Sequence, residues 1–410
     1  MLAFTRATTP PASFLTRTFA SLPTVLPLSP EFSSGPCKKF PGYNLSSLPN
    51  RNFGRSHRSS VGKATLKHAI DESKRLLNLP EGFRLGIVPA SDTGAYEMAM
   101  WNFLGHPEGV KEVDVLHWES FGKGWWGDVD SHLQLGKGGA DVEEHSAEYG
   151  KLPDLSKTRG GDADTLFTFN GTTSGVRLPK SDPLGWLKPS STRKGLTFCD
   201  ATSAAFAMEM DWDKLDVTTY SWQKVLGGEG GHGVLILSPR AVERLEELGA
   251  VPGRPLPKIF RLLKKGKLDE AIFTGATINT PSMLAVEDYI AALSWADSVG
   301  GVPGLISRSE ANLSVLTSFV SSNPWIDFLA KEEDIRSSTS VCLTLDLTAK
   351  EIKTFCSLLE EKGAALDIGG YRDAPPSIRI WCGSTVEKED VEKLMPWLTW
   401  AYETVVEGRE

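Results

Sequence analysis

The chain has 410 residues, of which 40% are hydrophobic and 23% charged, and its formal net charge is -8. This length allows two or three domains with buried cores, and the acidic balance argues against a nucleic-acid partner. The five cysteines form no C-x-x-C pair, which disfavours a disulfide framework and a metal site alike. No apolar run reaches the ~18 residues of a membrane-spanning helix, so no membrane partner is expected.

The first 30 residues have the composition of an organelle transit peptide. They contain Arg6 and Arg17 and many Ser and Thr, and no acidic residue occurs before Glu31. Four prolines interrupt the apolar run that a secretory signal would need. We therefore predict that residues 1–30 direct the chain to the mitochondrion, with the plastid as the alternative.

Helical and strand patterns then follow one another along the chain. Apolar residues at near-helical spacing predict an amphipathic helix over 62–78, and a second helix is predicted to begin near Gly94. Short apolar runs predict buried strands at 85–91, 113–118, 164–170, 195–200 and 233–238. Strands separated by helices predict a parallel sheet whose ligands bind at the carboxyl ends of the strands.

The last part of the chain has a different pattern. Strands are predicted at 341–347 and 377–383, a helix at 350–363 and a terminal helix at 389–403. We therefore predict an α/β fold with a large domain over 31–298, built on a mostly parallel sheet, and a smaller α+β domain over 299–410.

A glycine-rich stretch, GEGGHG at 228–233, matches the pattern of a dinucleotide-binding loop. That fingerprint requires a strand before the glycines and a helix after them. Here an apolar strand follows the glycines, so we reject the dinucleotide interpretation. What remains to be explained is the single lysine, Lys224, that precedes them.

Three features together predict a pyridoxal 5′-phosphate site. Lys224 can form a Schiff base and then move the α-proton of a substrate, and Asp200 ends an apolar strand, where it can keep the ring nitrogen of the cofactor protonated. The stretch SDTG at 91–94 leads from a strand into a helix whose N-terminus can bind the phosphate. Each feature alone is weak, whereas the ordered set is specific.

The motifs in this order resemble those of phosphoserine aminotransferases, which are fold-type I, class V pyridoxal phosphate enzymes. The motifs are SHRSSVGKATLKHAIDESKRLLNLP, SWQKVLGG and INTPSM, and the match runs from about residue 32 to the terminal helix. The chain is most similar to a divergent branch of that family. The resemblance implies that an amino group is exchanged between glutamate and 3-phosphohydroxypyruvate, giving O-phospho-L-serine and 2-oxoglutarate in L-serine biosynthesis. The resemblance also implies that the enzyme accepts the four-carbon analogue of this substrate that is used in vitamin B6 synthesis.

The resemblance also implies roles for residues at the cofactor. Lys224 matches the Schiff-base lysine, Asp200 the partner of the ring nitrogen, Gln223 a phosphate ligand and Thr172 the partner of the cofactor's 3-hydroxyl. The same family match places Phe121 on the cofactor ring, with Trp125 as the alternative.

Two pairs of residues have implied roles at the cofactor phosphate. Asp92 and Thr93 stand where the majority branch has Gly-Arg, so their contacts are expected to come from backbone N–H groups and the threonine hydroxyl. Asn279 and Thr280 match a pair that reaches the phosphate from a neighbouring subunit, which implies a homodimer.

Four basic residues match the substrate-binding positions of the family: His57, Arg58, Arg372 and Arg379. The substrate carries both a carboxylate and a phosphate, so more than one cation is needed to bind it. We expect Arg379 to bind the α-carboxylate, and the other three to bind the distal phosphate or the γ-carboxylate of glutamate.

Three alternatives are weighed against this interpretation. Another class V enzyme, such as a serine or alanine–glyoxylate aminotransferase, would not need the phosphate-binding arginines. A cysteine desulfurase is disfavoured because its cysteine nucleophile would have to come from predicted strands or a helix, which hold Cys199, Cys342, Cys356 and Cys382. A non-catalytic binding protein of the same fold is disfavoured because Lys224 and Asp200 are both present.

Overall fold

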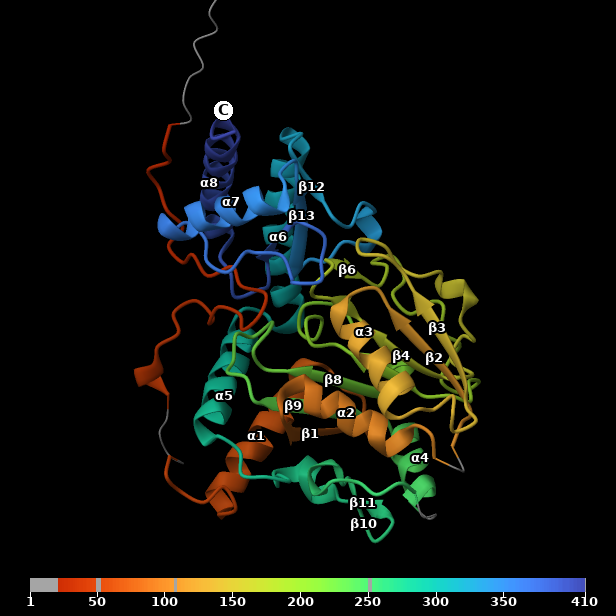
Figure 1. Cartoon of the computed structure of the whole chain (residues 1–410). Helices are drawn as coiled ribbons and strands as arrows, with labels where there is room; N and C mark the ends of the chain where they lie inside the picture. The colour runs from red at the N-terminus through yellow and green to blue at the C-terminus, as the bar shows by residue number, and fades with distance from the viewer. Residues whose placement is uncertain (1–20, 49–52, 107–108, 250–252, 410) are drawn as a thin grey trace, which may run out of the picture.

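The computed structural model describes residues 21–48, 53–106, 109–249 and 253–409. Its main feature is a seven-stranded sheet with the strand order β1-β9-β8-β7-β4-β2-β3 (Figure 1). The strands are β1 (Arg84–Pro89), β2 (Glu112–His117), β3 (Asp141–Ser146), β4 (Asp164–Thr168), β7 (Thr197–Asp200), β8 (Val217–Ser221) and β9 (His232–Leu237).

Most of this sheet is parallel. The run β3-β2-β4-β7-β8 pairs in parallel, whereas β9 is antiparallel to both of its neighbours, β8 and β1. The prediction of an α/β fold with a mostly parallel sheet is therefore confirmed.

Helices cover both faces of the sheet, which explains its continuous apolar strands. Along β9, Val234 and Ile236 belong to one hydrophobic core, and Leu235 and Leu237 belong to the other, because successive side chains point to opposite faces. The helices α1 (Ser60–Leu76) and α5 (Met283–Ser298) contribute to the first core, and the second includes side chains of α2 (Ser91–Phe103), α3 (Ser120–Gly127) and α4 (Pro239–Gly249).

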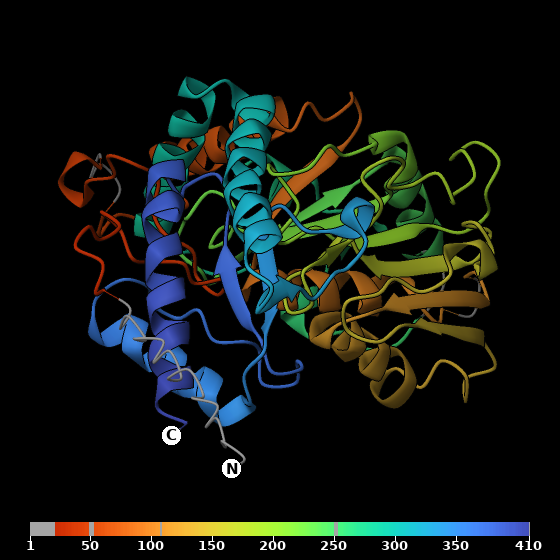
Figure 2. The same ribbon diagram turned by 90° about the horizontal axis from the view of Figure 1, so that it is seen from above.

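The C-terminal part lies above the main sheet in Figure 1, and in the view from above its helices lie to the left of most of the sheet (Figure 2). Its antiparallel sheet consists of β12 (Ile326–Phe328), β13 (Ser340–Leu345) and β14 (Ile378–Trp381). The accompanying helices are α6 (Gly301–Ser322), α7 (Ala349–Glu361) and α8 (Lys388–Glu407).

The N-terminal segment runs alongside this C-terminal part. The backbone N–H of Leu366 donates to the carbonyl of Pro30 (2.8 Å), and that of Trp381 donates to the carbonyl of Phe32 (2.9 Å). The proposed domain division at residues 298 and 299 stays a prediction.

The remaining elements are short. Two hairpins are formed by β5 (Asn170–Gly171) with β6 (Val176–Arg177) and by β10 (Leu263–Lys264) with β11 (Lys267–Leu268). Single helical turns lie at Leu45–Ser47, Asp128–His132, Leu155–Lys157, Trp212–Lys214, Lys258–Phe260, Glu270–Thr274 and Glu333–Ile335. Among the described helices, none is both long enough and apolar enough to cross a membrane.

Two strands of the main sheet were not predicted. The edge strand β3 has the sequence DVEEHS and is largely exposed, so it lacks an apolar run. The other, β8, has the sequence VTTYS and is buried throughout, but its two threonines hide the apolar pattern. Its position matters for function because β8 leads directly to Lys224.

Candidate active site

A cavity of about 320 Å³ lies at the carboxyl edge of the main sheet. The strands β1, β2, β4, β7 and β8 all end there, and the segment after each contributes to the wall. The lining residues include seven of those predicted from the sequence: Asp92, Thr93, Phe121, Thr172, Asp200, Gln223 and Lys224. Residues far apart in the chain thus meet where an α/β fold usually binds its ligand.

Lys224 lies three residues beyond β8 and is buried, with 7% of its surface exposed. Its Nζ donates to the backbone carbonyl of Ser34. Burial lowers the pKa of Lys224, and the nearby charge of Arg379 lowers it further, against the opposite effects of Cys37, Asp200 and Glu119. A lowered pKa raises the fraction of neutral amine, which is the form that attacks a carbonyl or accepts a proton.

Asp200 is held in place by two donors. The indole Nε1 of Trp125 donates to its Oδ2 (3.1 Å), and the backbone N–H of Thr202 donates to its Oδ1 (3.0 Å). Both oxygens are therefore oriented at the end of β7, where the carboxylate can face the cavity.

The N-terminus of α2 forms another part of the wall. Ala90 and Ser91 both have left-handed backbone conformations, with φ of 68° and 54°. A side chain at Gly94 would place its Cβ 2.3 Å from the carbonyl oxygen of Pro89, and one at Gly233 would lie 2.2 Å from that of Ser91. These glycines let α2, β1 and β9 approach closely. The first N–H groups of α2 have no partner within the helix and can bind an anion.

Polar groups from both parts of the chain meet at Thr172. Its hydroxyl donates to Ser203 Oγ (2.9 Å), while its carbonyl accepts from Ser340 Oγ (2.6 Å). Asn170 Nδ2 also donates to Ser203 Oγ (2.7 Å). This network joins the wall of the cavity to β13 of the C-terminal part.

The cavity walls fit a polar cofactor such as pyridoxal phosphate. The side-chain oxygens of Thr168, Ser221 and Gln223 are buried and lack hydrogen-bond partners among the residues that the structure describes. Buried polar atoms in native structures are normally bonded, so these atoms indicate a polar ligand or water. The buried amine of Lys224 and the oriented carboxylate of Asp200 add the reactive groups that this cofactor requires.

The two aromatic candidates occupy different positions. Trp125 is almost fully buried and bonds Asp200, whereas Phe121 is 42% exposed. The ring of Phe121 lies 5.6 Å from that of Tyr371. Phe121 thus remains the proposed residue for stacking on the cofactor, and Trp125 has a separate task in orienting the acid.

Arg379 and Arg372 differ in exposure. Arg379 lies on β14, partly buried, and its Nη1 donates to the carbonyl of Thr172 (3.4 Å). The side chain of Arg372 is 81% exposed and lies 3.6 Å from the carboxylate of Asp373. Both guanidinium groups lie near the ring of Tyr371, at 5.7 Å and 5.6 Å from its centre.

Besides Arg372 and Arg379, four predicted residues do not line the cavity of their own chain: His57, Arg58, Asn279 and Thr280. The first two precede α1, and the other two precede α5. Except for the buried His57, they are exposed. Gly275 approaches the backbone of Lys63 and Lys67 so closely that a Cβ would lie 2.4 Å from the Lys63 carbonyl, which places the segment before Asn279 beside α1.

Sequence reasoning missed one buried acid beside the site, Glu119. Its carboxylate accepts from the N–H of Gly122 (2.7 Å) and the hydroxyl of Thr173 (2.7 Å), and burial raises its pKa. It caps α3 and fixes the turn that carries Phe121. Its position directly after the predicted strand 113–118 was a signal that could have found it.

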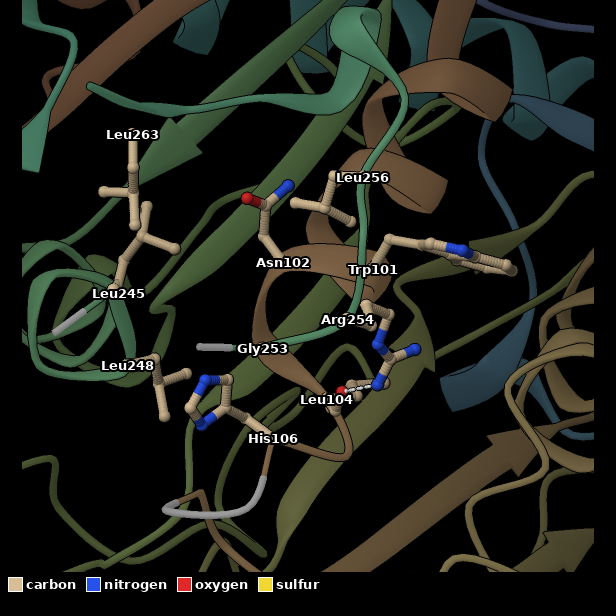
Figure 3. Close-up of a pocket in the computed structure, with 11 residues that line it drawn as sticks. Trp101, Asn102, Leu104, His106, Leu245, Leu248, Gly253, Arg254, Leu256 and Leu263 are labelled. Atoms are coloured by element: carbon tan, nitrogen blue, oxygen red, sulfur yellow. Dashed lines mark hydrogen bonds between the residues drawn. The ribbon is translucent and has the colours of Figure 1, made fainter. Parts of the chain in front are cut away.

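A separate cavity of about 290 Å³ lies between α4, the C-terminal end of α2 and residues 253–263 (Figure 3). Arg254 reaches across it to the carbonyl of Leu104. Leu104 follows Thr93 by eleven residues, which corresponds to about 17 Å along a helix. This cavity is therefore distinct from the one that contains Lys224.

Comparison with known proteins identifies the family. No protein-family model matches the chain. A phosphoserine aminotransferase of Methanosarcina barkeri (strain Fusaro / DSM 804) is 55% identical over 383 residues, covering 93% of this chain and 99% of that protein. The phosphoserine aminotransferase of Methanosarcina mazei has the same identity and coverage. The chain belongs to the phosphoserine aminotransferase family.

Solved structures show the same fold at lower identity. A phosphoserine aminotransferase of Cytophaga hutchinsonii has a TM-score of 0.76 and 24% identity, covering 90% of this chain and 98% of that one. The phosphoserine aminotransferase of Trichomonas vaginalis, solved with pyridoxal phosphate bound, has a TM-score of 0.70 and 18% identity, covering 90% and 99%. The predicted fold-type I architecture is confirmed.

The predicted mitochondrial location, with its plastid alternative, is wrong. The relatives at 55% identity are enzymes of Methanosarcina, archaea that have neither organelle. They also argue against the transit-peptide interpretation of residues 1–30, of which 1–20 lie outside the described residues. The abundance of Ser and Thr, together with Arg6 and Arg17, suggested a leader but is not specific to one.

The cysteines of this family member lack the properties of a nucleophile. Burial raises the pKa of Cys37 and Cys342 to about 12 and that of Cys356 to about 11. It also raises the pKa values of Cys199 and Cys382. A desulfurase needs a reactive thiolate, which these environments disfavour.

His232 connects the Lys224 segment to the segment before α5, and its interactions predict a pH effect on stability. Its ring stacks on Trp222 at 4.7 Å, and its Nε2 accepts from the N–H of Ser282 (3.2 Å). Burial lowers the pKa of His232 below its ordinary value of 6.5. As pH falls through 6.5, the unfolded chain therefore gains this proton before the folded chain does, and stability is lost.

We expect the urea midpoint of the wild type to fall more steeply than that of His232→Gln over this pH range. The difference between the two proteins isolates His232 from the other histidines. Parallel pH curves for the two proteins would show that His232 does not contribute.

Proposed function

We propose that this chain is a phosphoserine aminotransferase that uses pyridoxal 5′-phosphate to exchange an amino group between glutamate and 3-phosphohydroxypyruvate. The products are 2-oxoglutarate and O-phospho-L-serine, which places the reaction in L-serine synthesis. The observation that carries the proposal is the meeting of Lys224, Asp200 and the N-terminus of α2 around one cavity. Family membership at 55% identity supports the substrate assignment.

Lys224 and Asp200 have separate roles in the proposed reaction. Bound pyridoxal phosphate supplies an electron sink for the electrons left when the substrate loses its α-proton. Lys224 would hold the cofactor through its Nζ, and its free amine would accept the α-proton of the substrate and then donate it again. Asp200, oriented by Trp125 and Thr202, holds a proton on the ring nitrogen.

The anionic groups of the cofactor and the substrate need fixed donors. We assign the cofactor phosphate to the first N–H groups of α2, the hydroxyl of Thr93 and the side chain of Gln223, because all of them line the cavity. Thr172 is assigned to the cofactor's 3-hydroxyl. Arg379 is assigned to the α-carboxylate of the substrate because it bonds the carbonyl of Thr172 in the cavity wall.

The proposed function includes a homodimer. His57, Arg58, Asn279 and Thr280 lie outside their own chain's cavity, and exposed apolar side chains accompany them: Phe53, Val61 and Leu284. Clusters of exposed apolar side chains often mark protein interfaces. In a symmetric dimer formed through this face, each copy would place these four polar residues at the cavity of the other copy.

The function is tested with the purified protein and its two half-reactions. Glutamate should bleach the visible absorption of the bound cofactor, and 3-phosphohydroxypyruvate should restore it with release of O-phosphoserine. Pyruvate and glyoxylate serve as matched unphosphorylated acceptors. Restoration by glyoxylate or pyruvate as fast as by 3-phosphohydroxypyruvate would favour the serine or alanine–glyoxylate alternative.

The shared site predicts complementation between two inactive variants. A Lys224→Ala protein is mixed with an Asn279→Ala/Thr280→Ala protein under conditions that exchange subunits. In each mixed dimer, one cavity carries both defects and the other carries neither, so activity should rise above that of either parent. If exchange is demonstrated by mass and no activity returns, Asn279 and Thr280 do not act across the interface.

A further inference from the structure

The side chain of Asp92 is not directed toward solvent at the start of α2, as an acid in a first helical turn usually is. It is 6% exposed and lines the cavity together with Asp200. Its carboxyl group lies against that of Asp200 and beside the hydroxyl groups of Thr202 and Thr219. The backbone that places it is unusual, because the two preceding residues, Ala90 and Ser91, are both left-handed.

The two carboxyl groups have unequal surroundings. Asp200 accepts from Trp125 Nε1 and from the N–H of Thr202, and the positive charge of Lys224 acts on it. By contrast, Asp92 Oδ1 is buried and has no hydrogen-bond partner of good geometry within the described chain. Two carboxylates in contact cannot both remain ionised in a buried site, and the one without N–H donors and without a nearby cation takes the proton.

The other titratable groups that face the pair do not supply a positive charge to Asp92. Tyr96 and Cys199 both interact electrostatically with Asp92 and Asp200. The phenol of Tyr96 donates to the carbonyl of Phe198 (3.0 Å). Glu119, on the side of Asp200, is a further acid. Burial is the main cause that raises the pKa of Asp92 well above its ordinary range, and the charge of Asp200 is the second.

We propose that Asp92 is a positioning residue that stays protonated and donates its proton in a hydrogen bond to Asp200. The pair then carries one negative charge, located on the carboxylate that would face the cofactor's ring nitrogen, and Asp92 helps to fix the orientation of that carboxylate. The role at the ring nitrogen rests on the proposed function, whereas the shared proton is a property of the chain alone.

The shared proton is tested by infrared spectroscopy at neutral pH. Protein labelled with isotopic aspartate should show a protonated carboxylic acid band that is absent from Asp92→Asn, both with and without cofactor. Asp154→Asn is the matched control, because Asp154 accepts from Ser156 and its pKa is lowered, so it is ionised in the wild type. If Asp92→Asn and the wild type have the same carboxylic acid band, Asp92 is ionised and the proposal is wrong.

The positioning role is tested by cofactor affinity. Asp92→Asn keeps an N–H donor toward Asp200 and should bind pyridoxal phosphate within about threefold of the wild type, whereas Asp92→Ala should bind it about tenfold more weakly. The wild type should also show a change in cofactor absorption at high pH, as Asp92 ionises, and Asp92→Asn should lack it. Equal affinity of the Asn and Ala variants would overturn the role.

Two further outcomes are distinguishable. If Asp92→Asn does not fold, Asp92→Thr, which also retains a donor, replaces it in both experiments. If the protein binds no pyridoxal phosphate, the proposed function fails, and the infrared result on the cofactor-free protein still decides whether Asp92 holds the proton.

Discussion

Replacement of Lys224 by alanine should abolish transamination, with turnover falling by at least ~10³-fold, because alanine can neither bind the cofactor covalently nor carry the α-proton. The fold should survive, since the amine of Lys224 makes one hydrogen bond, to the carbonyl of Ser34, and its burial is unfavourable to its charged form. The measurement is steady-state turnover together with the visible absorption of the cofactor.

Lys151→Ala is the control for this experiment. The side chain of Lys151 is 69% exposed and, among the described residues, pairs with Glu148 alone, at 3.1 Å. Its loss should therefore leave turnover unchanged. If the Lys224→Ala protein retains turnover within tenfold of the wild type, a residue other than Lys224 acts as the base.

The sequence could predict Lys224 and Asp200 as a reactive pair at one site because the signals for these two residues are local. Lys224 stands before a glycine run and Asp200 ends an apolar strand, and both features can be read without knowing the fold. Their meeting follows from the rule that parallel strands share a carboxyl edge. The strand that brings Lys224 to that edge, β8, was nevertheless missed, because Thr218 and Thr219 are polar in sequence but buried in the sheet.

The relations that sequence reasoning could not reach are contacts between distant segments. The bond from Trp125 to Asp200 joins residues 75 positions apart, and nothing in either local sequence specifies it. The direction of the Asp92 side chain depends on two left-handed residues before it, neither of which is glycine. The prediction of an organelle location from the composition of residues 1–30 was wrong, because a bias toward Ser, Thr and Arg has several origins.

The two arginines for which the sequence predicted different roles also have different surroundings in the structure. Arg379 is partly buried on β14 and within reach of the cavity, whereas Arg372 is exposed on the loop that carries Tyr371. A guanidinium held against the cavity wall by its bond to Thr172 suits the α-carboxylate, which every substrate presents in the same place. An exposed one on a loop suits the distal group, which differs between glutamate and phosphoserine.

Arg379→Ala should therefore damage all substrates alike. The loss of a charge-assisted pair in a partly closed site amounts to about 2–5 kcal/mol, or roughly 30- to several-thousand-fold in kcat/KM. The test compares kcat/KM for O-phosphoserine, glutamate and alanine in the wild type and the variant. If kcat/KM falls for only one of these substrates, Arg379 does not bind the α-carboxylate that all of them share.

Arg372→Ala should instead act selectively, with a loss of about tenfold or more for O-phosphoserine and a smaller one for serine. A dianionic phosphate loses more than an uncharged hydroxymethyl group when a bidentate guanidinium is removed. Arg372→Lys is the matched variant, because it keeps the charge but not the planar fork, and it should fall between the wild type and alanine. If Arg372→Ala keeps the wild-type preference for O-phosphoserine over serine, Arg372 does not bind the phosphate. His57 and Arg58 of the proposed second subunit then become the candidates for that task.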